Sequence, residues 1–256
     1  MAQTPRPDAP RKARTAWLDC LRGFTVLNMI AYHASWDLVY IFGKDWPWYH
    51  GTGAYIWQQC ICCTFITLSG FCAAFSRHPV KRGLIVSGIG LGVMAVTILF
   101  MPEDMVKWGV LTLIGAGMLL IGALRRYLQK LPAWAGLPLC VLLFGMTRHT
   151  AAGYWGLWRL PLVSLPGWLY RNDLTALFGF PGPDFYSTDY FALLPWVFLF
   201  LSGFYAYHLF GKQVMAVPWK GFAPLNFIGR HALEIYVVHQ PVIYGILWLL
   251  EMIGRK

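Results

Sequence analysis

Long apolar segments alternate with short polar loops along the whole chain. A membrane-spanning helix needs about 20 mostly apolar residues, and the segments that approach this length lie at about 16–42, 52–75, 83–101, 106–124, 131–146, 189–210 and 227–250. The segment 131–146 is short, whereas 16–42 is longer than needed and contains polar residues. The pattern predicts an all-α fold, a polytopic membrane helix bundle with about seven transmembrane helices.

One aromatic stretch, 147–188, departs from this pattern. Within it, residues 157–170 are apolar but interrupted by Pro161 and Pro166, and they are too few to span a bilayer. We expect a re-entrant or interfacial piece here. Non-helical backbone is tolerated at membrane depth only where protein or a wet cavity covers it, so we also expect a cavity nearby.

Composition makes lipid the expected surroundings of the bundle. Hydrophobic residues make up 57% and charged residues 12% of the chain, and the mean hydropathy is +0.51. Soluble domains carry about a quarter charged residues. We therefore expect a cytoplasmic tail at 1–15, a transmembrane domain at 16–250 and a short extracytoplasmic tail at 251–256. The basic N-terminal segment has no small-residue cleavage site and does not read as a signal peptide.

The distribution of positive charge predicts the orientation. Most of the 21 Lys and Arg residues fall on the side that holds the N-terminus, and that side is expected to be cytoplasmic. An odd number of spans then places the C-terminus on the outer side of the membrane. The net charge of +10 fits topology and lipid contact rather than nucleic-acid binding.

Cysteines and glycines in the apolar segments are expected to serve packing. Cys60, Cys62 and Cys63 do not share one face of a helix, so we expect no metal site there. Glycines that would allow the third and fourth segments to approach closely are Gly88, Gly90, Gly92, Gly115, Gly117 and Gly122.

Polar side chains form a stripe along the first segment. Asp19, Arg22, Val26, Met29, His33 and Asp37 follow one another at spacings of three and four residues. His33 and Asp37 lie one turn apart, so the carboxylate could orient the imidazole as a general base. A structural hydrogen bond between helices is an equally good interpretation. His50, before the second segment, is either a further catalytic histidine or an interfacial residue beside an aromatic belt.

The last segment and the start of the sixth supply further candidates. Arg230 and Glu234 are spaced to form an ion pair, and His239 and Gln240 lie at membrane depth before Pro241, which removes a helix hydrogen bond. Either a ligand site or a packing role would explain His239. Asp189 and Tyr190 open the sixth segment, where Asp189 either stabilises the helix start or contacts a substrate.

Three motifs resemble those of a known family. They are Arg-x-x-x-Leu-Asp-x-Leu-Arg-Gly at 14–23, followed by His33-x-x-x-Asp37; Asp-Tyr-Phe-x-Leu-Leu-Pro-Trp at 189–196; and Phe-Ile-Gly-Arg-His-Ala-Leu-x-Ile-Tyr-x-x-His-Gln-Pro at 227–241. Together they resemble the bacterial transmembrane acyltransferases related to heparan-α-glucosaminide N-acetyltransferase. The resemblance covers most of the chain, from about residue 14 to 250.

The resemblance implies an enzyme that moves an acetyl or other short acyl group from cytosolic acyl-CoA to a hydroxyl or amine of a sugar or glycan acceptor. It implies an essential histidine near the outer ends of the first two helices, which is matched here by His50 or by His33 with Asp37. Residues in the family motifs that would bind donor or acceptor are Arg22, Asp189, Tyr190, Arg230, His239 and Gln240. Homo-oligomers are common among such proteins, but no pattern in this chain requires one.

Two other function classes fit parts of the pattern. A proton-coupled transporter or flippase could use the His33–Asp37 stripe as a proton relay, whereas a membrane scaffold would need no such stripe. Dependence on CoA discriminates between them. The cytoplasmic basic residues Arg77, Lys81, Arg82, Arg125 and Arg126 either attract CoA phosphates or only set the topology.

Overall fold

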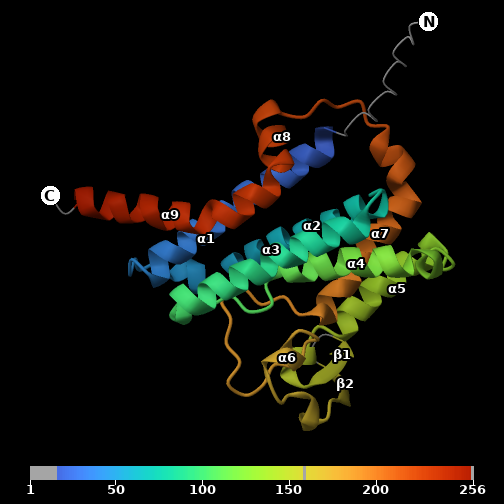
Figure 1. The fold of residues 1–256 in the computed structure, drawn as a ribbon, viewed down its shortest axis with the longest axis horizontal. Coiled ribbons are helices and arrows are strands. Elements are labelled where there is room, and N and C mark those ends of the chain that lie inside the picture. Colours follow the sequence, from blue (N-terminus) through green and yellow to red (C-terminus); the bar gives the residue numbers. More distant parts are fainter. Residues whose placement is uncertain (1–15, 158–159, 255–256) are drawn as a thin grey trace, which may run out of the picture. The chain divides into compact units, whose positions relative to one another are not determined.

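The computed structural model describes residues 16–157 and 160–254, and this part of the chain is mostly helical (Figure 1). It divides into two compact units, Met1–Gln58 with Gln213–Lys256, and Gln59–Lys212. Each apolar segment expected from the sequence contains a helix. These helices are α1 (Ala16–Tyr40), α2 (Thr52–Ala74), α3 (Pro79–Phe100), α4 (Val110–Leu128), α5 (Ala133–Met146), α7 (Leu193–Met215) and α9 (Ala232–Gly254).

Five of these helices, α2, α3, α4, α7 and α9, are long and apolar enough to cross a membrane, which supports a multi-pass membrane protein. The helix α1 has 25 residues but is more polar, because it carries Asp19, Arg22, His33 and Asp37. The helix α5 has 14 residues and is only about 21 Å long at about 1.5 Å per residue. Seven crossing helices therefore stay a prediction.

In the first unit, α1 lies against the short helix α8 (Ala223–Arg230) and against α9. The contacts advance in the same direction along both chains: Asp19 lies at Gly229, His33 at His239 and Asp37 at Gln240. The helix α1 therefore runs parallel to α8 and α9. A 3-10 turn, η1 (Pro47–His50), follows α1 in this unit.

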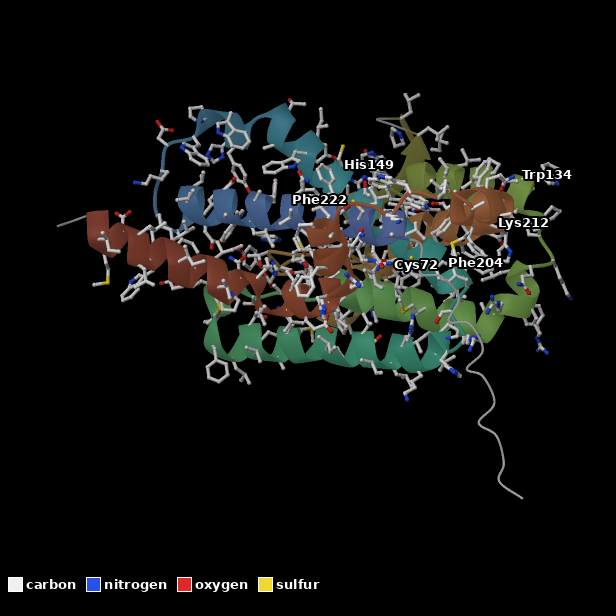
Figure 2. All side chains as sticks on the ribbon, turned by 90° about the horizontal axis from the view of Figure 1, so that it is seen from above. Cys72, Trp134, His149, Phe204, Lys212 and Phe222 are labelled. Carbon is white, nitrogen blue, oxygen red and sulfur yellow. The ribbon has the colours of Figure 1, made fainter. Side chains whose placement is uncertain are left out.

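In the second unit, α3 and α4 lie side by side (Figure 1). A Cβ atom placed on Gly83 would lie 2.9 Å from the carbonyl oxygen of Gly115, and one on Gly90 would lie 2.9 Å from the backbone nitrogen of Thr112. The expected glycine-mediated packing is confirmed for Gly90 and Gly115, whereas Gly88 and Gly92 face open space. On α7, the ring of Phe204 (labelled in Figure 2) is fully buried.

Two expected boundaries are wrong, and the aromatic stretch contains a hairpin. Residues 154–164 form an antiparallel hairpin of β1 (Tyr154–Leu157) and β2 (Leu160–Ser164), with Pro161 on a strand that is exposed throughout, where proline is tolerated. A 3-10 turn, η4 (Gly167–Leu169), follows the hairpin. The last span is broken at His231, between α8 and α9. The sixth helix begins at Leu193 rather than at Asp189.

The structure describes one of the two expected terminal tails in part. The expected cytoplasmic tail, 1–15, lies outside the described residues. At the other end, α9 includes residues 251–254, and their place outside the membrane stays a prediction. The remaining short helix of the second unit, α6 (Asp173–Ala176), lies in the long stretch between α5 and α7.

Candidate active site between α1 and α9

Two glycines allow α1 and α8 to touch along their backbones. A Cβ atom on Gly23 would lie 2.0 Å from the carbonyl oxygen of Leu225, and one on Gly229 would lie 1.8 Å from that of Asp19. No side chain larger than hydrogen fits at either position without a shift of the main chain. The guanidinium of Arg22 adds a hydrogen bond of 3.2 Å to the Gly229 carbonyl and an ion pair of 3.1 Å with Asp19.

Most of the polar stripe expected on α1 is buried. Four of its six residues, Asp19, Val26, Met29 and Asp37, are buried, and Asp37 is 0% exposed, whereas Arg22 and His33 are half-buried. Because the six positions share one side of the helix, the burial of these four means that this side of α1 is covered over most of its length.

Asp37 is bound by a residue from the far end of the sequence. The amide nitrogen of Gln240 on α9 donates to its Oδ1 at 2.6 Å, across 203 residues of chain. The amide oxygen of Gln240 is buried without a hydrogen-bond partner in the part of the chain that the structure describes. A buried acceptor of this kind is costly, and a ligand donor could satisfy it.

His33 lies one helical turn before Asp37, His239 immediately precedes Gln240, and the two imidazoles meet across the two helices. Their ring centroids are 4.8 Å apart in an edge-on arrangement. The Nδ1 atom of His239 lies 2.5 Å from the carbonyl oxygen of Tyr236. A carbonyl only accepts hydrogen bonds, so Nδ1 of His239 is assigned the proton and Nε2 is the basic nitrogen of the neutral ring.

Two aromatic residues, Tyr49 and Tyr32, connect His50 to His33. Its Nδ1 lies 3.4 Å from the hydroxyl of Tyr40, and its ring contacts Tyr49. Tyr49 packs on Tyr32, which in turn contacts His33 edge-on. Burial raises the pKa of the Tyr49 hydroxyl well above its ordinary value, so this hydroxyl stays protonated and donates to the Tyr32 carbonyl.

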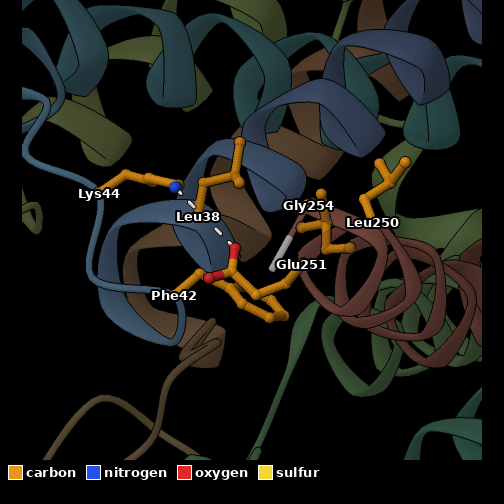
Figure 3. A pocket seen from close by; sticks show the side chains of 7 residues that line it. Leu38, Phe42, Lys44, Leu250, Glu251 and Gly254 are labelled. Atoms are coloured by element: carbon orange, nitrogen blue, oxygen red, sulfur yellow. Dashed lines mark ion pairs between the residues drawn. The ribbon is translucent and has the colours of Figure 1, made fainter. Parts of the chain in front are cut away.

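A cavity opens at the ends of α1 and α9, beginning at the residue after Asp37 (Figure 3). It measures about 380 Å³, and its walls include Leu38, Phe42 and Leu250. Lys44 and Glu251 face one another across it with a 3.9 Å ion pair. Its size lies within the range of small-molecule pockets, about 300–1,000 Å³.

Comparison with protein families identifies the chain. The model for the heparan-alpha-glucosaminide N-acetyltransferase catalytic domain matches residues 14–241. The chain belongs to this acetyltransferase family. The match extends from just before α1 to Pro241, and so includes His33, Asp37, His239 and Gln240. No curated protein and no solved structure matches the chain.

Asp189 and Tyr190 of this acetyltransferase lie in the second unit, in the loop before α7. Oδ2 of Asp189 accepts from the backbone nitrogen of Val110 at 3.4 Å, so it stabilises the N-terminus of α4 rather than of its own helix. The hydroxyl of Tyr190 donates to the Ala176 carbonyl at 2.6 Å. Burial raises the pKa of this hydroxyl well above its ordinary value.

Within the part of the chain that the structure describes, Arg230 does not form the ion pair that its spacing from Glu234 predicts. It is exposed, and its Nε donates to the carbonyl oxygen of Asn226 at 3.0 Å within α8. The ion pair expected with Glu234 is not found among the described residues, because the helix is interrupted at His231 between them. Arg230 thereby remains at the surface of the acetyltransferase.

Arg148 was not predicted as a site residue from the sequence. Its guanidinium donates to the Gln59 side chain and lies over the Trp196 ring, 4.6 Å from the centroid. These partners come from α2 and α7, so the spacing of residues around Arg148 gave no signal of them. All six cysteines of the chain are free thiols.

Proposed function

We propose that the protein is a membrane-embedded acetyltransferase that moves an acetyl group from cytosolic acetyl-CoA to a hydroxyl or amine of a sugar or glycan acceptor. The observation that carries this proposal is the meeting of His33, Asp37, His239 and Gln240 between α1 and α9 in a member of the acetyltransferase family. Both motifs that supply these residues lie within the family match.

The proposed chemistry needs one base. A neutral imidazole takes the proton from the acceptor hydroxyl or amine as the oxygen or nitrogen attacks the thioester carbonyl. The new C–O or C–N bond forms, the C–S bond breaks, and the CoA thiolate leaves and takes up a proton. The basic Nε2 assigned to His239 and the ring of His33 are the candidates for this base. Transfer through an acyl-histidine would use the same rings as nucleophiles.

Asp37 and Gln240 are proposed to hold the reacting groups in place. The Asp37 carboxylate fixes the Gln240 amide, whose buried oxygen can accept from the acceptor hydroxyl or amine. The cavity beside Leu38 is wide enough for a sugar-sized acceptor. Its Lys44–Glu251 pair supplies polar groups of both signs at the rim.

The other motif residues have supporting roles in the proposal. His50 lies within the aromatic chain that reaches His33 and is proposed as a second catalytic histidine. Arg22, Asp189, Tyr190 and Arg230 remain proposed contacts for donor or acceptor.

The test is acetyl transfer by the purified chain in detergent, with acetyl-CoA as donor and glucosamine-ended sugars as acceptors, followed by release of the CoA thiol. Loss of the histidine that acts as the base is expected to lower kcat by at least 100-fold, roughly the contribution of a general base. His33→Ala, His239→Ala and His50→Ala are each expected to lower activity, and the size of the loss identifies the base. His231→Ala, which removes an exposed ring at the junction of α8 and α9, serves as the matched histidine control and should retain activity. Full activity in all three site variants would remove the assignment.

The same preparation tests the transport alternative. In proteoliposomes, solute uptake that needs no acyl donor and is lost in His33→Ala would favour a proton-coupled transporter. Thiol release that requires an acceptor, with no uptake, supports the acetyltransferase.

A further inference from the structure

A small cavity lies at the turn between α2 and α3, and none of the residues that line it takes part in the proposed chemistry. It measures about 250 Å³ and is lined by Phe75, Ser76, Arg77, His78 and Arg82. A water molecule occupies about 30 Å³ in the liquid, so the cavity can admit a group of several heavy atoms.

Ser76 is the buried polar group of this cavity. It is 8% exposed, and its hydroxyl has no hydrogen-bond partner in the described part of the chain. Leaving a buried hydroxyl unpaired costs about 1–3 kcal/mol. A hydroxyl can donate to an oxygen of a bound group, which would remove this cost.

The arginines that line the cavity give it positive charge. Arg77 and Arg82 are exposed at its wall. Arg125 of α4 reaches the same corner, where it donates to the carbonyl oxygen of Ala74 at the end of α2. The sequence has no acidic residue between Asp45 and Glu103, and Glu103 lies beyond the far end of α3. At 22 residues, α3 separates Glu103 from this corner by about 33 Å.

The first turn of α3 adds a further attraction for anions. His78 occupies the N-cap position but makes no side-chain hydrogen bond to the helix, and Pro79 follows it. Uncapped backbone N–H groups and the helix dipole favour a negative group at such an end. The helix end, the arginines and the buried hydroxyl thus favour the same kind of ligand.

We propose that this cavity is a phosphate-binding site. Arg77 and Arg82 would bind the phosphate oxygens through charge-assisted hydrogen bonds, and Ser76 would donate a neutral one. Two sources present this chemistry: the nucleotide end of acyl-CoA and the headgroup of an anionic phospholipid. The first source rests on the proposed function, and the second does not.

The experiment measures binding of adenosine 3′,5′-bisphosphate to the purified full-length chain in detergent. Ser76→Ala and Arg82→Gln are each expected to weaken binding about tenfold, the effect of losing one hydrogen bond to a charged group. Lys130→Gln removes one positive charge from the turn after α4 and should leave the affinity unchanged. Ser76→Ala turns an unpaired buried hydroxymethyl group into a methyl group, so its melting temperature should not fall.

A second arm separates the two sources. If the bisphosphate does not bind, wild-type protein in nanodiscs should bind phosphatidylglycerol in preference to phosphatidylcholine. Ser76→Ala should lose this preference. The phosphate that the site binds is then that of a lipid headgroup. If neither probe distinguishes wild type from Ser76→Ala and Arg82→Gln, the site is refuted. Bisphosphate binding without acetyl transfer would keep the site and refute the proposed function. Acetyl transfer by a protein in which Ser76→Ala changes the binding of neither probe would keep the proposed function and refute the site.

Discussion

At the scale of single residues, the most demanding group to bury is the carboxylate of Asp37. A buried carboxylate is stable only where donors replace the water that it has lost. One of these donors is the Gln240 amide at 2.6 Å. The interaction between the two side chains therefore links the stability of the first unit to the geometry of the proposed site.

A double-mutant cycle measures this link. In Asp37→Ala and Gln240→Ala, each single substitution should lower the free energy of unfolding, and the double variant should lose less than their sum. The expected coupling is about 0.5–3 kcal/mol, as for residues in direct contact. Denaturant unfolding in detergent gives the four free energies.

Ser35 provides the comparison for this cycle. Its hydroxyl donates to the Ala31 carbonyl within α1 and so does not depend on α9. Ser35→Ala and Gln240→Ala should therefore add. Additivity in the Asp37 cycle as well would contradict the hydrogen bond.

Sequence spacing could identify these residues but not pair them correctly. It placed His33 and Asp37 one turn apart on α1, where neighbours at three and four positions share a face. The partners Gln240 and His239 arrive from a helix more than 200 residues later, and no rule of spacing links the two helices. The family motifs include both pairs of residues, and the structure shows that they are in contact.

At the scale of elements, the close approach of α1 and α8 depends on Gly229. Gly229→Ala should lower the free energy of unfolding by about 1–3 kcal/mol or more, because the added Cβ meets the Asp19 backbone, which cannot move independently. The same variant should lower acetyl transfer, since the contact aligns α1 with α9. Unfolding in denaturant and the thiol-release assay report the two effects.

Gly245, in α9, is the matched control. A Cβ atom there meets nothing within 4 Å. Alanine is favoured over glycine inside a helix by about 0.5–1 kcal/mol, so Gly245→Ala should be neutral or stabilising. A loss of stability equal to that of Gly229→Ala would show that close packing at Gly229 is not the cause.

Helices were predictable as elements, but their ends and interruptions were not. The apolar period located every long helix, because each needs a run of apolar residues to face lipid or other helices. The break at His231 has no proline to announce it, and the hairpin at 154–164 depends on pairing between strands rather than on local pattern. Asp189 stabilises α4 instead of α7 for the same reason, since its partner Val110 is distant in sequence.

At the scale of the whole molecule, the parallel course of α1 and α9 bears on topology. If both cross the membrane in the same direction, an odd number of crossings must lie between them. The helices α2, α3, α4 and α7 are four long apolar candidates, so α5 would have to supply the fifth. Its length of about 21 Å would then require the bilayer to thin locally or the flanking residues to complete the span.

A reporter fused after Lys256 tests this count. We expect it outside the cytoplasm, as seven crossings from a cytoplasmic N-terminus require. A second reporter inserted between Arg77 and His78, in the turn after α2, should lie inside. A cytoplasmic signal after Lys256 would mean an even number of crossings, so that α5, or one of α1 and α9, does not cross.

The long sequence separation between Asp37 and Gln240 also has a consequence in time. Ribosomes add about 5–20 residues per second, so Gln240 is made about 10–40 s after Asp37. During that interval α1 has two carboxylates, an arginine and a histidine but not the helices that later cover them. A charged group at the centre of a bilayer costs about 2.5–3.5 kcal/mol on insertion. We therefore expect α1 to remain beside the insertion machinery until α8 and α9 emerge. The first helix to be synthesised would then be among the last to reach its final position in the bundle.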